Sequence, residues 1–191
     1  MPQAKTLTES EIQKLLAYIE TKPNAGRNRV MFLLTIWAGL RVSEVAGLTI
    51  TDVRNPDGSI RTEIYLDASR VKHGHAGVVY LNARLQQELA QYVTSKRWYE
   101  PDQALFTTQA KPRKGFTANT LTQHFHYLYR GAGIYGGSSH SGRRTFITTL
   151  ANKGVSVRLL ASLVRHANIS TTQHYIDVND GMKRQAIELA Y

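Results

Sequence analysis

A small set of basic, histidine and tyrosine side chains has the types and spacing for chemistry on an anionic ester. Arg41 precedes a Val-Ser-Glu string, and Arg143 lies three positions after His140. Tyr175 lies nine positions after His166. Two guanidinium groups can hold a phosphate with forked, charge-assisted hydrogen bonds. A phenol becomes an effective nucleophile when cations and a proton acceptor surround it. These residues therefore suit nucleophilic attack on a phosphodiester.

Each of these side chains also has an ordinary structural interpretation. An arginine at a helix start usually lies on a solvated surface, and an isolated tyrosine usually packs in a core or an interface. His140 could be a loop histidine, and His166 could cap the C-terminal end of a helix. The catalytic hypothesis therefore depends on the order and spacing of the whole set.

Apolar periodicity and capping residues predict helices over most of the chain. Thr8 and Glu11 fit a capping box, and Gly154 fits a helix C-cap. The predicted helices cover residues 8–20, 25–38, a short stretch after 41, 85–93, 117–130, 143–152, 155–164 and 171–175. Two β-rich runs, 60–66 and 78–81, are bounded by the turn sequences at 55–58 and 72–75. We predict an α+β fold that is mostly helical, with one small antiparallel sheet.

Length and charge narrow the class of protein. The chain has 191 residues and a mass of 21.5 kDa, which favours one domain spanning residues 1–191. Its formal net charge is +10, so nucleic acid is the leading candidate partner, and a basic protein without such a partner is the alternative. Cysteine is absent, which excludes disulfides, thiolate catalysis and cysteine-ligated zinc, and which favours a cytoplasmic protein.

Neither end nor interior of the sequence predicts membrane insertion. The longest mostly apolar stretch, 30–40, is too short to span a bilayer, and the first ten residues contain no apolar signal region. The pairs His73/His75 and His124/His126 lack the cysteines or carboxylates of a metal site, so we predict no metal.

Five sequence fragments together resemble the tyrosine recombinases of the phage integrase family. The fragments are Ala-Gly-Leu-Arg41-Val-Ser-Glu44, Lys72 in its predicted β-turn, His140-Ser-Gly-Arg143, Arg165-His166, and Ser170 to Tyr175. The likeness has no gap from His140 to Val178 and covers nearly the full chain from Leu7 onward. It implies the catalytic-domain fold of that family and site-specific cleavage and rejoining of DNA through a 3′-phosphotyrosyl intermediate.

The resemblance also implies a role for each matching residue. Tyr175 would be the nucleophile, Arg41 and Arg143 the phosphate clamps, His140 a proton acceptor, His166 a phosphate ligand and Lys72 the general acid. Arg70, His73 and His75 lie in the same predicted turn as Lys72. Each of them is an alternative to Lys72 as the residue of this turn that faces DNA. Glu44, one helical turn after Arg41, would orient a neighbouring basic group. No cofactor is implied, because the phosphotyrosyl bond conserves the energy of the cleaved bond.

The family implies double-stranded DNA as a partner, self-association as a tetramer on DNA, and no membrane. It also implies an enzyme of a bacterial or phage mobile element that acts in the cytoplasm at the nucleoid. The tail at about 180–190 places apolar residues on one helical face, which would pack either on its own domain or, as in the family, on a neighbouring protomer.

The sequence departs from the family pattern in three places. Nothing corresponds to the N-terminal DNA-clamping domain, so the chain is either a natural single-domain recombinase or an excised fragment. Gly142 and Arg144 flank Arg143 where an apolar residue and a histidine are usual, and Arg165 replaces a common glycine. These departures bear on the rate and DNA specificity of the implied reaction rather than on its mechanism. Two alternative functions stay open: a non-catalytic DNA-binding regulator, and DNA relaxation of the topoisomerase IB type.

Overall fold

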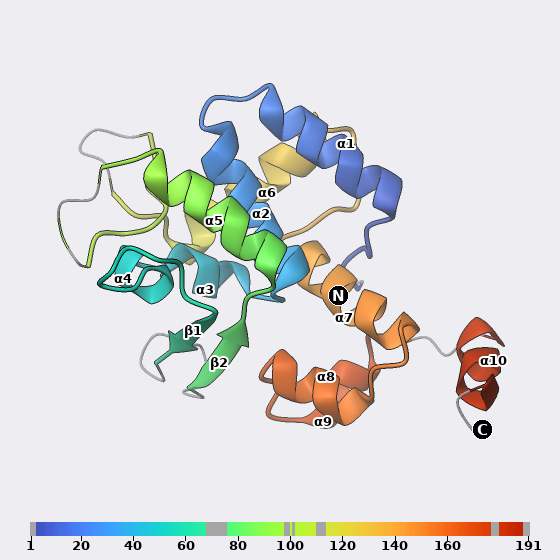
Figure 1. Ribbon diagram of the computed structural model, residues 1–191. Helices are drawn as coiled ribbons and strands as arrows, with labels where there is room; N and C mark the ends of the chain where they lie inside the picture. Colours follow the sequence, from blue (N-terminus) through green and yellow to red (C-terminus); the bar gives the residue numbers. More distant parts are fainter. Residues whose placement is uncertain are drawn as a thin grey trace.

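The computed structural model describes residues 3–67, 76–97, 100, 102–109, 114–176 and 180–188. Its helices are α1 (Glu9–Glu20), α2 (Ala25–Trp37), α3 (Val42–Ala46), α4 (Ile50–Val53), α5 (Ala83–Thr94), α6 (Ala118–Gly131), α7 (Ser141–Asn152), α8 (Val157–Leu163), α9 (Ile169–Gln173) and α10 (Asp180–Glu188). Its strands are β1 (Glu63–Leu66) and β2 (Gly77–Tyr80). Figure 1 shows the helices α1, α2, α5 and α6 gathered on one side and α7 leading from them to α8 and α9.

Helix α2 is the central element of the larger apolar core. Its residues Val30 to Ile36 are buried almost throughout, as expected for a helix that is apolar on most of its faces. It packs against α1, α5 and α7. The amphipathic helix α1 begins at the predicted capping box, in which Thr8 and Glu11 bond each other's backbone amides, and buries Leu15 and Ile19 against this core.

The small sheet consists of β1 and β2 paired in antiparallel register, with Glu63 opposite Tyr80 and Leu66 opposite Gly77. Ile64 and Val79 point into the core, whereas Tyr65 and Tyr80 are exposed, so the sheet has one buried and one solvated face. Residues 68–75, where the sequence predicts the turn that carries Lys72, lie outside the described residues.

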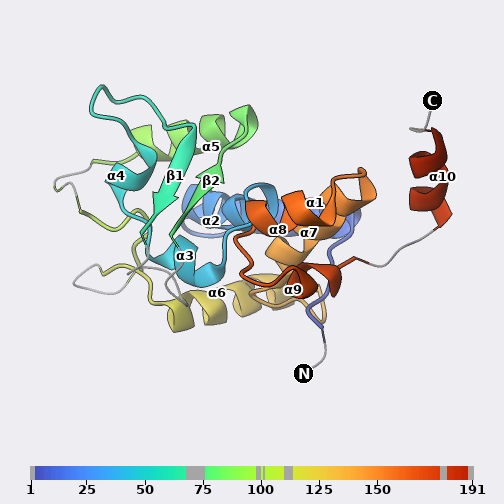
Figure 2. The ribbon, with the colours of Figure 1, turned by 90° about the horizontal axis from the view of Figure 1, so that it is seen from below.

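A second, smaller apolar cluster lies between α7, α8 and the segment after α9. Its buried members are Ile147, Ala151, Leu160 and Val164, and Tyr175 packs against it. Helix α7 also packs along α2 and so joins the two clusters. Both views show α10 standing apart from the rest of the molecule (Figures 1 and 2), and its Ile187 is 71% exposed.

The predicted α+β class and the small antiparallel sheet are confirmed, and the predicted helices appear with shifts of a few residues at their ends. The helix α4 was not predicted, because four residues are too few to show a period. Gly154 lies one residue beyond the C-cap of α7, at a φ of 83°, which is the left-handed position that commonly ends a helix.

Candidate active site

The predicted site residues line one cleft of about 560 Å³. They come from the start of α3, the start of α7, the loop after α8 and the end of α9. The cleft brings together five of the six residues selected from the sequence: Arg41, His140, Arg143, His166 and Tyr175. The sixth, Lys72, lies outside the described residues. The sequence thus predicted a set that the fold gathers from positions far apart in the chain.

Arg41 is held at the N-terminus of α3 by Glu44. The Arg41 backbone amide donates to Glu44 Oε2 at 2.7 Å, and its Nη1 donates to Glu44 Oε1 at 2.8 Å. Glu44 therefore fixes Arg41 at the start of the short helix by two contacts, a capping hydrogen bond to the backbone and an ion pair with the guanidinium. With 29% of its side chain exposed, Arg41 keeps an open side toward solvent.

Arg143 is the more enclosed guanidinium, with only 6% of its side chain exposed. Its Nη1 donates to the Gly39 carbonyl at 2.6 Å, and its Nη2 donates to the Val164 carbonyl. Gly39 has a φ of 66°, and a Cβ there would lie 2.6 Å from the Phe146 ring, so the turn that supplies this carbonyl requires glycine. Burial and the nearby Arg41 lower the pKa of Arg143 to about 9, and the group stays charged at neutral pH.

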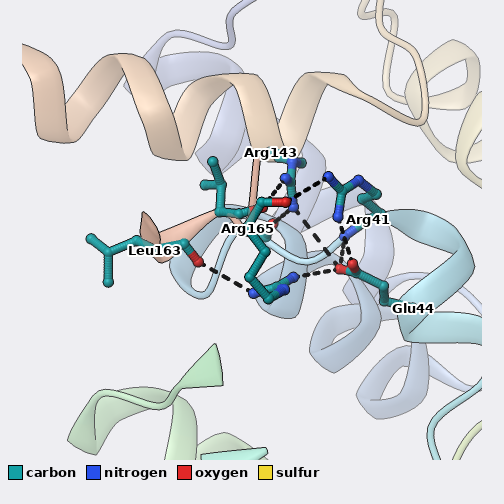
Figure 3. A network of polar contacts seen from close by, with 7 residues as sticks. Arg41, Glu44, Arg143, Leu163 and Arg165 are labelled. Atoms are coloured by element: carbon teal, nitrogen blue, oxygen red, sulfur yellow. Dashed lines mark hydrogen bonds and ion pairs between the residues drawn. The ribbon is translucent and has the colours of Figure 1, made fainter. Parts of the chain in front are cut away.

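Glu44 lies at the centre of this network, and its side chain is 1% exposed (Figure 3). Beyond its bonds to Arg41, its Oε2 pairs with Arg165 Nη2 at 2.7 Å and lies 3.9 Å from Arg143 Nη1. Three guanidinium groups thus share one carboxylate, and the network keeps an excess positive charge. The predicted role of Glu44 in orienting a basic group is confirmed, and it extends to two further arginines.

Arg165 contributes to the site in a way that its sequence position alone did not show. Its φ is 56°, a left-handed conformation that glycine adopts without strain and arginine rarely adopts. Its side chain, 7% exposed, runs across β2, where a Cβ on Gly77 would lie 2.4 Å from Arg165 Cδ. The missing side chain at Gly77 makes room for the arginine that reaches Glu44.

His166 is anchored by a hydroxyl group and surrounded by cations. Its Nδ1 lies 2.8 Å from Oγ1 of the fully buried Thr172. Burial, followed by the charges of Arg143 and Arg41, lowers the pKa of His166 to about 4, so the ring is neutral at pH 7. Because Nδ1 of this neutral ring is hydrogen-bonded to Thr172, Nε2 is the nitrogen that can bond to a ligand.

Tyr175 lies at the edge of the cleft, half-buried, rather than in the interior. Its ring stacks on the His166 ring, with centroids 6.1 Å apart and planes 23° apart. Its backbone is held by Thr172, whose carbonyl accepts from the Tyr175 amide at 3.0 Å, and by Thr148 Oγ1, which donates to the Tyr175 carbonyl at 3.3 Å. The phenol therefore shares one cleft with both arginines of the expected clamp.

His140 precedes α7 as its N-cap residue and is exposed at the mouth of the cleft. Its amide donates to Ser138 Oγ at 3.3 Å. The packing of α7 explains why glycine stands at position 142 in the Ser-Gly-Arg-Arg string. A Cβ on Gly142 would lie 2.0 Å from Thr35 Oγ1 on α2. Glycine at 142 lets α7 approach α2 closely and so carries Arg143 toward Gly39.

Sequence reasoning assigned no role to Thr172, and it treated Arg144 only as a departure from the family pattern. The signal for Thr172 was its place in the Ser-Thr-Thr-Gln-His-Tyr string, but its contact with His166 depends on how α9 folds back. Arg144 lines the cleft and lies over the Tyr175 ring, with Cζ 5.4 Å from the ring centroid.

The part of the chain that the structure describes contains neither a metal-binding cluster nor a membrane-spanning helix. No group of three or more His, Cys, Asp or Glu side chains there could hold a metal ion. His124 of the His124/His126 pair lies 3.0 Å from Asn28 Oδ1 through its Nε2. Among the same residues, no helix is both long enough and apolar enough to cross a bilayer.

Comparison with known proteins places this fold and site in a family. A family model described as the phage integrase family matches residues 5–182. The tyrosine recombinase XerA of Pyrococcus horikoshii is 31% identical over 187 residues, which are 97% of this chain and 61% of the relative. The tyrosine recombinase XerD of Pseudomonas putida is 30% identical over 180 residues, which are 93% and 58% of the two chains.

Solved structures show the same fold. The crystal structure of XerA recombinase superposes with a TM-score of 0.74 at 23% identity, over 99% of this chain and 66% of that one. The Tn1549 transposon integrase, in complex with circular intermediate DNA, gives a TM-score of 0.76 at 20% identity, over 100% and 68% of the two chains.

The chain thus has the fold of the tyrosine recombinases. It belongs to the phage integrase family, and the family predicted from the sequence is confirmed. The chain spans about three fifths of the length of the curated relatives that it matches.

Proposed function

We propose that this chain is a site-specific tyrosine recombinase that cleaves and rejoins double-stranded DNA. The observation that carries the proposal is the shared cleft, which brings together Tyr175, His166 and the guanidinium groups of Arg41 and Arg143. Among the described residues, no carboxylate lines this cleft, and the nearby Glu44 is already paired with arginines. The net charge of +10 supports a polyanionic substrate. The names of the two relatives described above, both tyrosine recombinases, support the reaction.

In the proposed reaction, Tyr175 Oη attacks the phosphorus of one DNA strand. The bond from phosphorus to the 5′ oxygen breaks, a 3′-phosphotyrosyl bond forms, and the phenolic proton passes to His140. Arg41 and Arg143 hold the non-bridging oxygens as negative charge grows on them, and His166 Nε2 bonds the same phosphate. A 5′ hydroxyl of a partner strand then attacks the phosphotyrosyl bond and returns the phenol.

The departing 5′ oxygen needs a proton, and we assign Lys72 as its donor. The assignment rests on the sequence resemblance and on the need for a general acid at that oxygen. A 5′-bridging phosphorothiolate substrate tests it, because a thiolate leaves without protonation. Lys72→Met should slow cleavage of the ordinary duplex far more than that of the thiolate duplex. Arg70→Met, which removes the same charge two positions earlier in the sequence, should slow cleavage of both substrates equally or of neither.

The first experiment identifies the substrate and the nucleophile together. The tagged chain is incubated with a plasmid library of genomic fragments from its source, the reaction is stopped with detergent, and the covalently attached DNA is sequenced. A nicked suicide duplex of the recovered site then traps the adduct. We expect wild type and Tyr135→Phe, whose ring is 82% exposed and outside the cleft, to give the adduct, and Tyr175→Phe to give none. An adduct with Tyr175→Phe would refute the assignment.

The two rival functions predict different products from the same reactions. A DNA-binding regulator with this fold would shift the recovered duplex in a gel without nicking it. An enzyme of the topoisomerase IB type would relax supercoiled plasmid and yield no recombinants between two copies of the site. Recombinant products that depend on Tyr175 would exclude both.

We further propose that residues 1–191 act as one catalytic domain that assembles as a tetramer on DNA, in the cytoplasm at the nucleoid, as part of a mobile element. Helix α10 supports the assembly, because it stands apart from the rest of its own chain with Ile187 exposed, which leaves that side chain free to pack on a neighbouring protomer. Solved relatives with the same fold include an XerH site-specific recombinase bound to its difH substrate, at a TM-score of 0.72. Ile187→Asp should leave DNA binding by one protomer intact and reduce the slower-migrating assemblies in a gel shift.

A further inference from the structure

Arg144 is a second buried arginine on α7 that the proposed reaction does not use. It directly follows Arg143, is 7% exposed and lines the same cleft. Among the described residues its Nη1 is buried and has no hydrogen-bond partner. A buried guanidinium with an unsatisfied donor costs free energy, so its retention needs a compensating interaction.

The Tyr175 ring provides that interaction. Arg144 Cζ lies 5.4 Å from the centre of the ring, within the range of a cation–π contact. The same ring stacks on His166. The side chain proposed as the nucleophile is therefore bounded by a guanidinium from α7 and by an imidazole from the loop after α8.

The N-terminal segment holds Arg144 in this position. Arg144 Nε donates to Thr6 Oγ1 at 2.9 Å, and the next amide, that of Leu7, donates to Thr145 Oγ1 on α7 at 2.9 Å. Gln3 Nε2 donates to the His174 carbonyl at 3.3 Å, one residue before Tyr175. Residues 3–7 thus brace both the arginine and the backbone that carries the phenol.

We propose that Arg144 is a positioning residue for Tyr175. It fixes the ring in the cleft by a cation–π contact and places a positive charge beside the phenol, where negative charge develops as the proton leaves. The inference rests on the proposed function, since it concerns how the nucleophile of that reaction is held. It assigns Arg144 to the rate of the chemical step rather than to the affinity for DNA.

Two substitutions separate charge from packing. Arg144→Met keeps a long side chain in the buried space and removes the charge, whereas Arg144→Lys keeps the charge and loses the planar fork. At saturating suicide duplex, we expect single-turnover cleavage to slow about tenfold for Arg144→Met and about threefold for Arg144→Lys. Thr6→Val, which removes only the acceptor of Nε, should slow cleavage about twofold to threefold.

The matched control is Arg130→Met, which removes the same charge from an exposed position of α6 outside the cleft and should leave the rate unchanged. Affinity is measured separately, with Tyr175→Phe added to each variant, and should change less than about twofold for Arg144→Met. Equal rates for the Met and Lys variants, or a loss found only in affinity, would overturn the proposal. Thermal unfolding of each variant shows whether a slow variant is simply unfolded, and Thr6→Val then carries the test.

A measurement without DNA distinguishes this inference from the proposed function. In protein labelled with 3-fluorotyrosine, the ¹⁹F resonance that disappears in Tyr175→Phe reports on that ring. It should shift in Arg144→Met and stay in place in Arg130→Met. An unshifted resonance would overturn the placement of Arg144 by itself. If the resonance shifts in Arg144→Met but the wild-type protein never forms a DNA adduct, the placement of Arg144 stands and the proposed reaction is refuted.

Discussion

The two apolar clusters of the molecule support different parts of the cleft. The larger cluster is built around α2 and includes Leu40, Val42 and Val45, the neighbours of Arg41 and Glu44. Among the described residues, the smaller cluster has four buried members, on α7, α8 and the turn after α8, and Tyr175 packs against it. Arg41 and Glu44 are thus attached to the large core and the nucleophile to the small one. Arg143 lies between them on α7, which packs along α2 but buries Ile147 and Ala151 in the small cluster.

This difference implies different local stabilities. Glu44 and Arg143 are almost fully enclosed and linked by ion pairs and carbonyl contacts, so the clamp is organised before substrate arrives. Segments with few buried apolar contacts open at a lower free energy than the global unfolding of the protein. We therefore expect the segment from α8 to Tyr175 to open locally while the clamp stays folded.

The strongest test of the clamp removes its shared carboxylate. Glu44→Gln keeps the shape of the side chain but leaves the guanidinium groups of Arg143 and Arg165 without a buried counter-charge. We expect the free energy of unfolding to fall by about 3–5 kcal/mol, measured by urea denaturation. Glu9→Gln, at an exposed position of α1, should cost less than about 1 kcal/mol. A loss for Glu44→Gln as small as that of the control would contradict a network centred on Glu44.

A cavity in each cluster tests the difference in local stability directly. Leu34 and Leu160 are both 0% exposed, one in each cluster. Leu34→Ala should lower the global free energy of unfolding by about 2–5 kcal/mol and speed amide exchange throughout. Leu160→Ala should speed exchange mainly in residues 157–173, by about 30-fold or more. Equal acceleration in α2 after Leu160→Ala would show that the two clusters unfold as one unit.

The close contact between α7 and α2 joins the two regions. Disturbing it should lower the free energy of unfolding by less than the substitutions above. Gly142→Ala would place a methyl group against Thr35 and should destabilise the protein by about 1–3 kcal/mol. Adding Thr35→Ala should recover part of that loss, as a double-mutant cycle would measure, because it removes Oγ1 but leaves Thr35 Cβ 2.8 Å from the new methyl group. Gly26→Ala adds the same methyl on α2, where the nearest atom is 4.0 Å away, and should be neutral or slightly stabilising. Destabilisation by Gly142→Ala that Thr35→Ala does not relieve would argue against a steric origin.

Histidine protonation should weaken both regions by a modest amount at low pH. Burial is the main cause that lowers the pKa of His124, on α6, and of His166, at the cleft, to about 4. In the unfolded chain these histidines bind protons near pH 6.5. The stability that their lowered pKa contributes to the folded state is therefore fully present above pH 6.5 and is lost as the pH falls toward 4.

Unfolding measured between pH 7 and pH 4.5 should therefore show a stability that declines with acidity. His124→Gln should flatten the decline by about 1–2 kcal/mol, a figure reduced for the solvent that still reaches the ring. His126→Gln, at an exposed position two residues further on α6, should leave the slope unchanged. A steeper decline after His124→Gln would contradict the direction of the shift.

Much of this protein was predictable because its signals are local. The capping box at Thr8, the apolar period of α1 and the left-handed glycine after α7 depend on residues within one or two helical turns of each other. The chemical set was predictable for another reason: an arginine pair, two histidines and a tyrosine at characteristic spacings leave few alternative reactions. The family and the identity of most candidate site residues therefore followed from the sequence alone.

Only the tertiary structure decided how these residues support one another. Arg165 crosses the bare Cα of Gly77, 88 positions away in the sequence, to reach Glu44. Arg144 contacts both the ring of Tyr175 and Thr6, which is 138 positions away. Such contacts depend on the packing of whole helices, which no short pattern records. Sequence determined which groups were present, and long-range packing determined which charges became buried, which found a counter-charge and which faced the nucleophile.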